Sequence, residues 1–143
     1  MPKNAALLAP IVAWSTAQLL KFLLDAIIKR RPDFTRLVNA GGMPSAHSSL
    51  VSCMSIMIGR IYGWESPIFA IASVLSLVVL YDAAGVRQAA GKQAKVINRI
   101  VEDIYKGSRI PEGRLKELLG HTPFEVLMGV MLGTVIGFAW ILR

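Results

Sequence analysis

Two histidines occur in the 143-residue chain, and both stand where a helix is predicted to begin. His47 follows the stretch Gly41–Ser45, in which two glycines and a proline precede a serine. Adjacent glycines let backbone N–H groups approach an anion, and a helix N-terminus adds free N–H groups and a positive dipole end. Pro44 or Ser45 is predicted to open the helix. A histidine here could exchange a proton with a bound phosphate, although the same residues also suit a plain helix start.

The second histidine, His121, directly precedes another helix-start signal. Thr122 as N-cap, Pro123 at the first helical position and Glu125 three residues after the cap form a capping box. Glu125 therefore has a structural role. It also follows His121 by four residues, so its carboxylate could orient the imidazole, as catalytic histidines require. Both interpretations of Glu125 stay open.

The elements that carry these residues are strongly apolar. Hydrophobic residues make up 54% of the chain and the mean hydropathy is +0.52, above the usual globular composition. A membrane-spanning helix needs about 20 apolar residues. The candidate spans are Ala5–Ile28, Pro67–Tyr81, Pro123–Leu142 and a shorter fourth stretch, Ser48–Tyr62. The fourth is rich in Ser, Met and Gly, which suits a helix packed inside a bundle or a tilted span. We predict an all-α integral membrane bundle of about four transmembrane helices, forming a single domain over residues 1–143.

The net charge of +7 would suggest nucleic acid in a soluble protein, but its distribution indicates topology. Basic residues fall mainly in two loops, 29–36 and 87–116. The positive-inside rule places both loops in the cytoplasm and both termini outside. We therefore expect no nucleic-acid partner, and membrane lipids with anionic headgroups as the partners of these charges. The expected location is a bacterial cytoplasmic membrane, with the site on its cytoplasmic face.

Three further features complete the predicted architecture. Lys21 and Asp25 lie four residues apart within the first span, and they form either part of a functional site or a structural ion pair. Apolar residues at three- and four-residue spacing over 86–104 predict an amphipathic helix at the membrane surface or over the bundle mouth. A short helix is predicted over Arg114–Leu119, closed by Gly120. The lone Cys53 is predicted to pack as a small hydrophobe.

The predicted topology brings His47, His121 and Arg87 to one membrane face. Phosphoryl transfer needs an anion cradle, a nucleophile and a proton donor for the leaving group, and these residues supply all three. The rival is a metal site, but two histidines without clustered Cys, His or carboxylate ligands make a poor zinc spacing. We expect no metal and no other cofactor.

The motifs around both histidines are similar to those of one superfamily. The segment Pro44–His47 reads Pro-Ser-Ala-His and resembles the Pro-Ser-Gly-His motif of the type-two phosphatidic acid phosphatase and vanadium haloperoxidase superfamily. The segment His121–Glu125 resembles the His-x-x-x-Asp ending of its last motif. Together with Tyr-Asp-Ala-Ala-Gly-Val-Arg-Gln at 81–88, these motifs make the chain resemble the small divergent branch of that superfamily from Lys21 onward.

The resemblance implies a phosphomonoesterase that works through a phosphohistidine. His121 would attack phosphorus, Glu125 would orient it and His47 would protonate the departing alcohol. The implied phosphate-binding residues are Arg87, Ser45, Gly42, Lys21 and Arg31. Such a cradle stabilises charge in the transition state.

The chain departs from the superfamily pattern at four places. Leu24 stands where the first motif has Lys, Ala46 replaces the Gly of the second, and Glu125 replaces the final Asp. Leu115 stands where the third motif has Arg. We favour Arg87 as the phosphate-binding arginine, because small residues beside it would let a phosphate approach, with Arg114 as the alternative.

The sequence thus predicts a membrane phosphatase that hydrolyses a lipid or isoprenoid phosphate without a metal. One alternative is a non-catalytic membrane protein that binds lipid phosphates or a partner through the same basic site. Vanadium-dependent oxidation is a weaker alternative, because a vanadate pocket and a phosphate pocket share their geometry.

Overall fold

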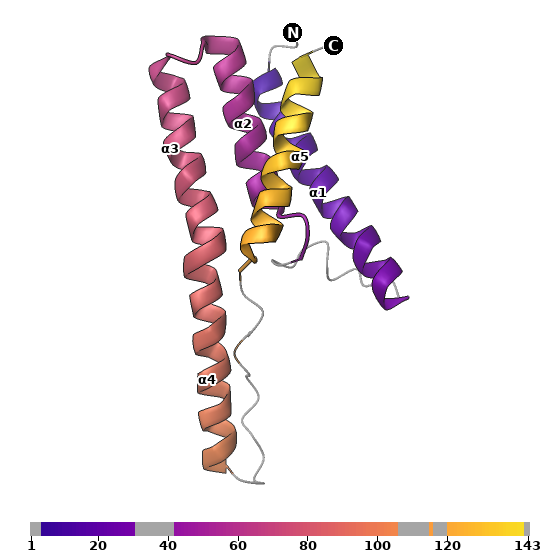
Figure 1. Ribbon diagram of the computed structural model, residues 1–143, viewed down its shortest axis with the longest axis vertical. Coiled ribbons are helices and arrows are strands. Elements are labelled where there is room, and N and C mark those ends of the chain that lie inside the picture. The colour runs from indigo at the N-terminus through magenta and orange to yellow at the C-terminus, as the bar shows by residue number, and fades with distance from the viewer. Residues whose placement is uncertain (1–3, 31–41, 106–114, 116–119, 142–143) are drawn as a thin grey trace.

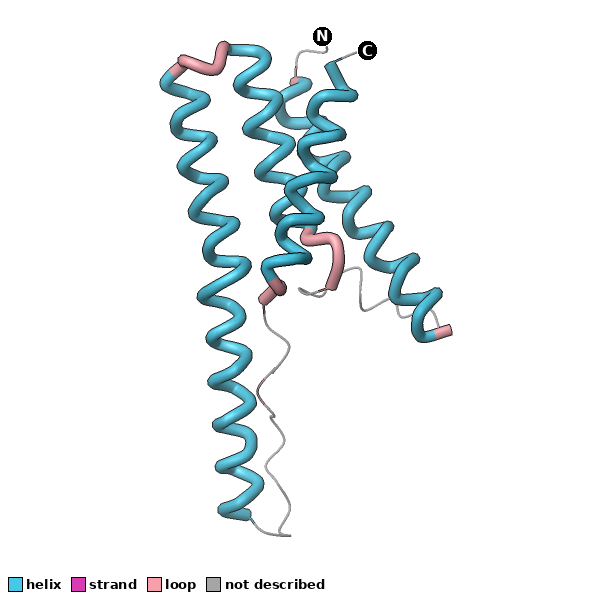
Figure 2. The backbone as a smooth tube through the Cα atoms, in the orientation of Figure 1, coloured by secondary structure: helices cyan, strands magenta, loops and turns pink. Residues whose placement is uncertain are grey.

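The computed structural model describes residues 4–30, 42–105, 115 and 120–141, and the described part contains helices and no strand. The helices are α1 (Ala5–Lys29), α2 (Ala46–Tyr62), α3 (Pro67–Tyr81), α4 (Arg87–Tyr105) and α5 (Pro123–Ile141). Figures 1 and 2 show that α1, α2, α3 and α5 form a bundle with both chain ends at the same end of it. The predicted all-α bundle is confirmed, and each predicted span matches a helix to within two residues.

The helix α2 lies at the centre of the bundle and packs against α1, α3 and α5. It runs parallel to α5, so both helices begin at the end opposite the chain termini (Figure 1). Ser45, not Pro44, caps α2: its hydroxyl accepts a hydrogen bond from the Ser48 N–H at 3.4 Å. Pro44 lies just outside the helix.

The contact between α2 and α5 depends on three glycines spaced four residues apart, Gly129, Gly133 and Gly137. A Cβ atom at Gly129 or Gly133 would overlap the carbonyl oxygen of Ser45 or Ser49. Small residues at this spacing let helix backbones meet closely in a membrane. This contact brings the first turns of α2 and α5 together.

The contact between α1 and the bundle uses a stripe of alanines at every fourth position. Ala5, Ala9, Ala13 and Ala17 are all buried, and the Ser49 hydroxyl donates to the Ala13 carbonyl at 3.2 Å. Cys53 and Met57 complete this core, so Cys53 packs as predicted. The stripe continues four residues further to Lys21, which is therefore buried too.

The helix α3 packs on α2 through serine hydroxyls. Ser55 and Ser76 lie 2.8 Å apart, and the Ser76 hydroxyl also approaches the carbonyl oxygens of Val51 and Ala72. Most of the large side chains on α3 are exposed. In a bilayer they would face lipid.

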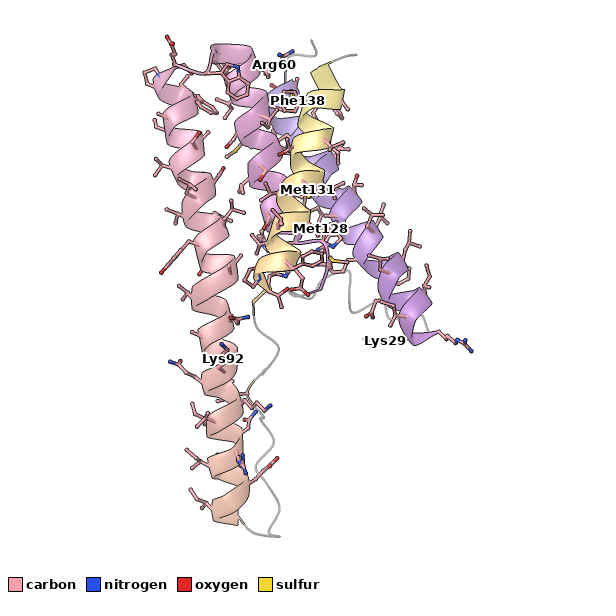
Figure 3. All side chains as sticks on the ribbon, in the orientation of Figure 1. Lys29, Arg60, Lys92, Met128, Met131 and Phe138 are labelled. Atoms are coloured by element: carbon pink, nitrogen blue, oxygen red, sulfur yellow. The ribbon has the colours of Figure 1, made fainter. Side chains whose placement is uncertain are left out.

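The amphipathic helix α4 does not lie across the bundle mouth. A π-helical segment, Asp82–Val86, joins it to α3, and α4 continues in line and projects beyond the bundle. Figure 3 places Lys92 on this projecting part. The described contact of α4 with the returning chain is at Asn98, whose side-chain amide pairs with the backbone of Leu115 at 2.9 and 3.0 Å. The rest of the short helix predicted over 114–119 lies outside the described residues.

Three helical segments are long and apolar enough to cross a membrane: α1, the joined segment from Pro67 to Glu102, and α5. The fourth, α2, has 17 residues and is enclosed by the others, in agreement with the expected packed or tilted span. Arg60 near the end of α2 lies at the end that holds both chain termini (Figure 3), with its guanidinium carbon 6.0 Å from the centre of the Phe138 ring.

Candidate active site

Two parallel helix N-termini meet at the end of the bundle opposite the chain termini. The Ser45 N–H, at the cap of α2, donates to the carbonyl oxygen of Glu125 in the first turn of α5 at 3.0 Å. Both helices direct their positive dipole ends toward this region. The contact therefore favours a bound anion.

The capping box predicted for α5 is present. The Thr122 N–H donates to Glu125 Oε2 at 2.8 Å, and the Glu125 N–H donates to the Thr122 hydroxyl at 3.3 Å. The same Oε2 atom lies 3.4 Å from Nδ1 of His121. Glu125 is thus placed for both of the roles that the sequence left open, helix capping and imidazole orientation.

His121 is a buried histidine, with 4% of its surface exposed. Its backbone N–H donates to the carbonyl of Ala83 at 3.0 Å, which ties it to the π-helical segment. Among the described residues Nδ1 has no hydrogen bond of good geometry, in spite of the nearby carboxylate. A buried polar atom without a partner is costly, so Nδ1 of this ring is one of the few buried polar atoms of the described residues that need an explanation.

Burial lowers the pKa of His121 below its ordinary value of 6.5. The carboxylate of Glu125 opposes this shift, and the positive charges of Lys21 and His47 add to it. The imidazole is consequently neutral at neutral pH, the form in which a histidine has a lone pair available for attack.

Lys21 contributes a buried positive charge to the same region. It is 4% exposed, and its ammonium group donates to the side-chain oxygen of Gln18 at 2.8 Å. Gly42 has a φ of +86°, and a Cβ there would come within 3.3 Å of Lys21 Cγ. Gly42 therefore lets the loop before α2 pack directly on the lysine stem.

His47 occupies the second residue of α2 and is exposed. Its charge acts on His121, which places both histidines in one electrostatic environment. An exposed imidazole can exchange a proton with water.

Arg87 is the first residue of α4 and directly follows the π-helical segment that holds His121. Its side chain lies outside the described part of the structure, as do Arg31, Gly41 and Arg114. Arg87 lies four residues after Ala83 in the chain. π-helical segments of this kind are frequent at functional sites.

Two features of the site were missed by the sequence interpretation. The buried Ser48 hydroxyl donates to the Ser45 hydroxyl at 2.8 Å, and Gly129 lets α5 approach these serines. The signal for Gly129 was present, because Gly129, Gly133 and Gly137 repeat a spacing known from helix contacts in membranes.

A family model described as "Divergent PAP2 family" matches residues 2–136. The chain belongs to this family. It is also 34% identical over 144 residues to the uncharacterized membrane protein YuiD of Bacillus subtilis strain 168, covering 93% of this chain and 91% of its relative. No solved structure matches the chain. Membership of the family and the apolar helices establish a membrane protein related to the phosphatases.

Proposed function

We propose that this divergent PAP2 protein is a membrane phosphatase that hydrolyses a lipid phosphate monoester through a phosphohistidine on His121. The observation that carries the proposal is the meeting of two parallel helix N-termini beside a buried histidine and a buried lysine. An anion site, a neutral nucleophile and a carboxylate partner are thereby combined.

In the first step Nε2 of His121 attacks phosphorus and the bond from phosphorus to the lipid oxygen breaks. The Glu125 carboxylate accepts a hydrogen bond from the Nδ1–H group of His121 and stabilises the positively charged ring that forms. His47 gives its proton to the departing alkoxide. Lys21, Arg87, Gly42 and the Ser45 cap bind the phosphoryl oxygens, where charge builds up.

In the second step a water molecule gives its proton to His47 and attacks phosphorus. The bond between nitrogen and phosphorus breaks, inorganic phosphate leaves and His121 returns to its neutral form. His47 is again protonated, so the cycle closes without a metal ion or an oxidant.

The basic residues of loops 29–36 and 87–116 support a site on the cytoplasmic face, because the same end of the bundle carries His121 and the positive-inside rule assigns that end to the cytoplasm. Fusion of a reporter at Arg99 tests this orientation. A reporter active only outside the cytoplasm would contradict it.

The test of activity is phosphate release from phosphatidic acid by purified protein in detergent micelles. We expect His121→Gln to lower kcat/KM by at least about a thousandfold, because no other group replaces a lost nucleophile. Lys21→Met should lower it by about a hundredfold, whereas Lys29→Met, with the same change on an exposed part of α1, should leave it unchanged.

Glu125→Gln separates the two roles of the carboxylate. Glutamine also serves in a capping box, so the helix start is retained while the charge beside His121 is removed. We expect stability to hold and activity to fall at least about tenfold. The complementary variant Thr122→Ala should lose stability and keep activity.

The role of His47 as proton donor is tested by changing the leaving group of the substrate. His47→Ala should lose about a hundredfold or more with phosphatidic acid, but release of nitrophenolate from p-nitrophenyl phosphate in the first turnover should persist, because this leaving group needs no proton. Phosphatidic acid that binds but releases no phosphate in wild type would contradict the enzyme and favour the binding protein. Halide oxidation with added vanadate would favour the third alternative.

A further inference from the structure

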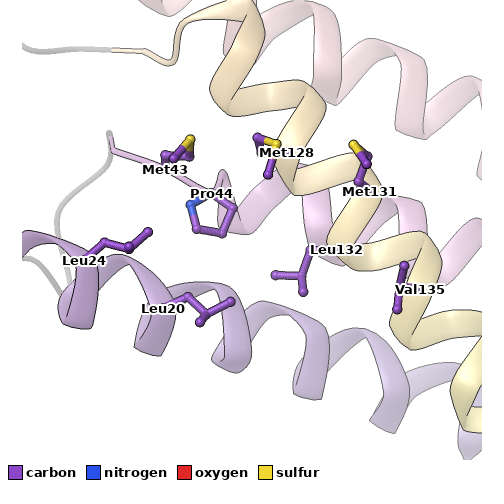
Figure 4. Close-up of a pocket in the computed structure, with 8 residues that line it drawn as sticks. All are labelled: Leu20, Leu24, Met43, Pro44, Met128, Met131, Leu132 and Val135. Atoms are coloured by element: carbon purple, nitrogen blue, oxygen red, sulfur yellow. The ribbon is translucent and has the colours of Figure 1, made fainter.

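An apolar groove of about 300 Å³ lies between α1 and α5, next to the candidate active site. Figure 4 shows the side chains that line it. They are Leu20 and Leu24 from α1, Met43 and Pro44 from the loop before α2, and Met128, Met131, Leu132 and Val135 from α5. The groove exists because α1 diverges from α5 toward the end of the bundle that carries the site (Figure 1).

One end of the groove adjoins the residues proposed to bind phosphate. Pro44 is bonded to Ser45 and Met43 to Gly42, so a single short segment contributes to both the groove and the phosphate site. On α1, Leu20 and Leu24 flank Lys21, whose side chain is buried. On α5, Met128 precedes Gly129, which contacts the Ser45 carbonyl.

The groove follows α5 away from the site. Met128, Met131, Leu132 and Val135 are spaced as one face of a helix, and this face extends about 10 Å along the axis. Methionines are flexible and adapt to irregular apolar partners. The shape suits a flexible chain that begins at the phosphate site and runs along α5.

From this continuity we infer that the groove binds one hydrocarbon chain of the substrate, so that the enzyme acts on phosphates carrying a long chain. The inference rests on the proposed function for the identity of the reacting group. The occupant is a chain of the same molecule whose phosphate lies at His121, because an amphiphile with its phosphate beside Lys21 has its apolar part next to Leu20, Leu24 and Met43. Leu24, which stands where the superfamily's first motif has Lys, then packs against this hydrocarbon chain.

The experiment compares phosphatidic acids with butanoyl, octanoyl and hexadecanoyl chains at equal mole fraction in mixed micelles. We expect kcat/KM of the wild type to rise with chain length. Met131→Trp and Val135→Trp fill the middle and the far end of the groove. Each should lower kcat/KM for the hexadecanoyl lipid by about tenfold, the equivalent of about two methylenes of lost burial, and leave the butanoyl lipid unchanged.

The two variants should also differ in the longest lipid chain that they accept. Met131→Trp should reduce turnover of the octanoyl lipid, whereas Val135→Trp should spare it, because Met131 lies about one helical turn closer to the site. Val74→Trp on α3 is the matched control: Val74 is 61% exposed and Val135 is 63% exposed, but Val74 does not line the groove. It should behave as wild type with all three lipids.

Equal loss of long-chain turnover in Val135→Trp and Val74→Trp, or a wild type indifferent to chain length, would overturn the inference. A wild type that hydrolyses none of the three lipids contradicts the proposed function instead. Native mass spectrometry then tests the groove by itself: hexadecanoyl phosphatidic acid should remain bound to wild type and Val74→Trp but not to Val135→Trp. Equal retention of phosphatidylcholine would show an ordinary membrane lipid in the groove, and a dimer lost on Val135→Trp would show a second copy. Either result overturns the inference.

Discussion

The central helix α2 is contacted by α5 and by α3 in two different ways. Both partners are strongly apolar, yet α5 approaches through glycines and α3 through serine hydroxyls. At α5 the contact is between backbones, since a Cβ at Gly133 would overlap the Ser49 carbonyl. At α3 it is made by side chains: the Ser76 hydroxyl lies 2.8 Å from the Ser55 hydroxyl and donates to the Val51 carbonyl at 3.1 Å.

This difference matters because the two contacts position different parts of the candidate site. The contact with α5 ends at Ser45 and Glu125, where the candidate site lies. The contact with α3 leads into the π-helical segment, where the Ala83 carbonyl accepts the His121 N–H, and then into α4, which projects away from the bundle. Backbones in direct contact allow little adjustment, whereas a hydroxyl can change its partner. The part of the candidate site formed by Ser45 and Glu125 is therefore placed where the geometry is fixed.

The largest expected effect follows from Gly133→Ala. The added methyl meets a backbone carbonyl that cannot move without displacing α2, so the intrinsic helix preference of alanine is outweighed. We expect a loss of about 2 kcal/mol in the free energy of unfolding, measured by SDS titration in mixed micelles. Gly137→Ala should cost less, because its Cβ would meet the Ile56 side chain at 2.9 Å, and a side chain can shift.

The control for overpacking is Ala139→Val on the exposed side of α5. It adds volume to the same helix away from α2 and should change stability by less than about 0.5 kcal/mol. A Gly133→Ala protein as stable as this control would show that α2 and α5 are not in backbone contact.

A smaller effect is expected for Ser76→Ala on the other side of α2. The change removes hydrogen bonds to Ser55 and Val51 and adds no volume. Hydrogen bonds between helices in a membrane contribute about 0.6 kcal/mol on average, so the loss should stay below about 1 kcal/mol. Ser73→Ala, the same change at another position of α3, is the control for Ser76→Ala. If Ser76→Ala lowered the free energy of unfolding as much as Gly133→Ala does, the distinction between the two contacts would be lost.

The helices and the capping box could be predicted from the sequence because their signals are local. Apolar runs mark the spans, and Thr122, Pro123 and Glu125 define a helix start without reference to the rest of the chain. The bundle also follows from these runs, because apolar helices of this length belong in a membrane.

The arrangement of the site depends on contacts between distant residues, which the apolar pattern does not encode. The burial of Lys21 follows from the alanine stripe on α1, and the approach of α5 follows from its glycines. For a similar reason one of the two placements expected for α4, over the bundle mouth, is wrong. A π-helical segment, Asp82–Val86, lets the helix continue in line from α3 into α4, which the apolar spacing over 86–104 does not predict.

His121 connects the two contacts of α2, since it lies two residues before α5 and its N–H donates to the carbonyl of Ala83 in the π-helical segment that follows α3. Its pKa is lowered by burial, so the unfolded chain binds a proton near pH 6.5 that the folded protein does not bind. The free energy of unfolding should therefore fall as the pH drops below about 6.5, and stop falling at the pKa of the folded protein. His121→Gln should lose this part of the pH dependence in SDS titrations at a series of pH values. If the curves of wild type and His121→Gln run parallel below pH 6.5, the ring is hydrated and not buried.

Gly129→Ala, which loosens the contact with α5, should bring the pKa of His121 back toward 6.5 in an NMR titration, and Ser76→Ala should leave it lowered.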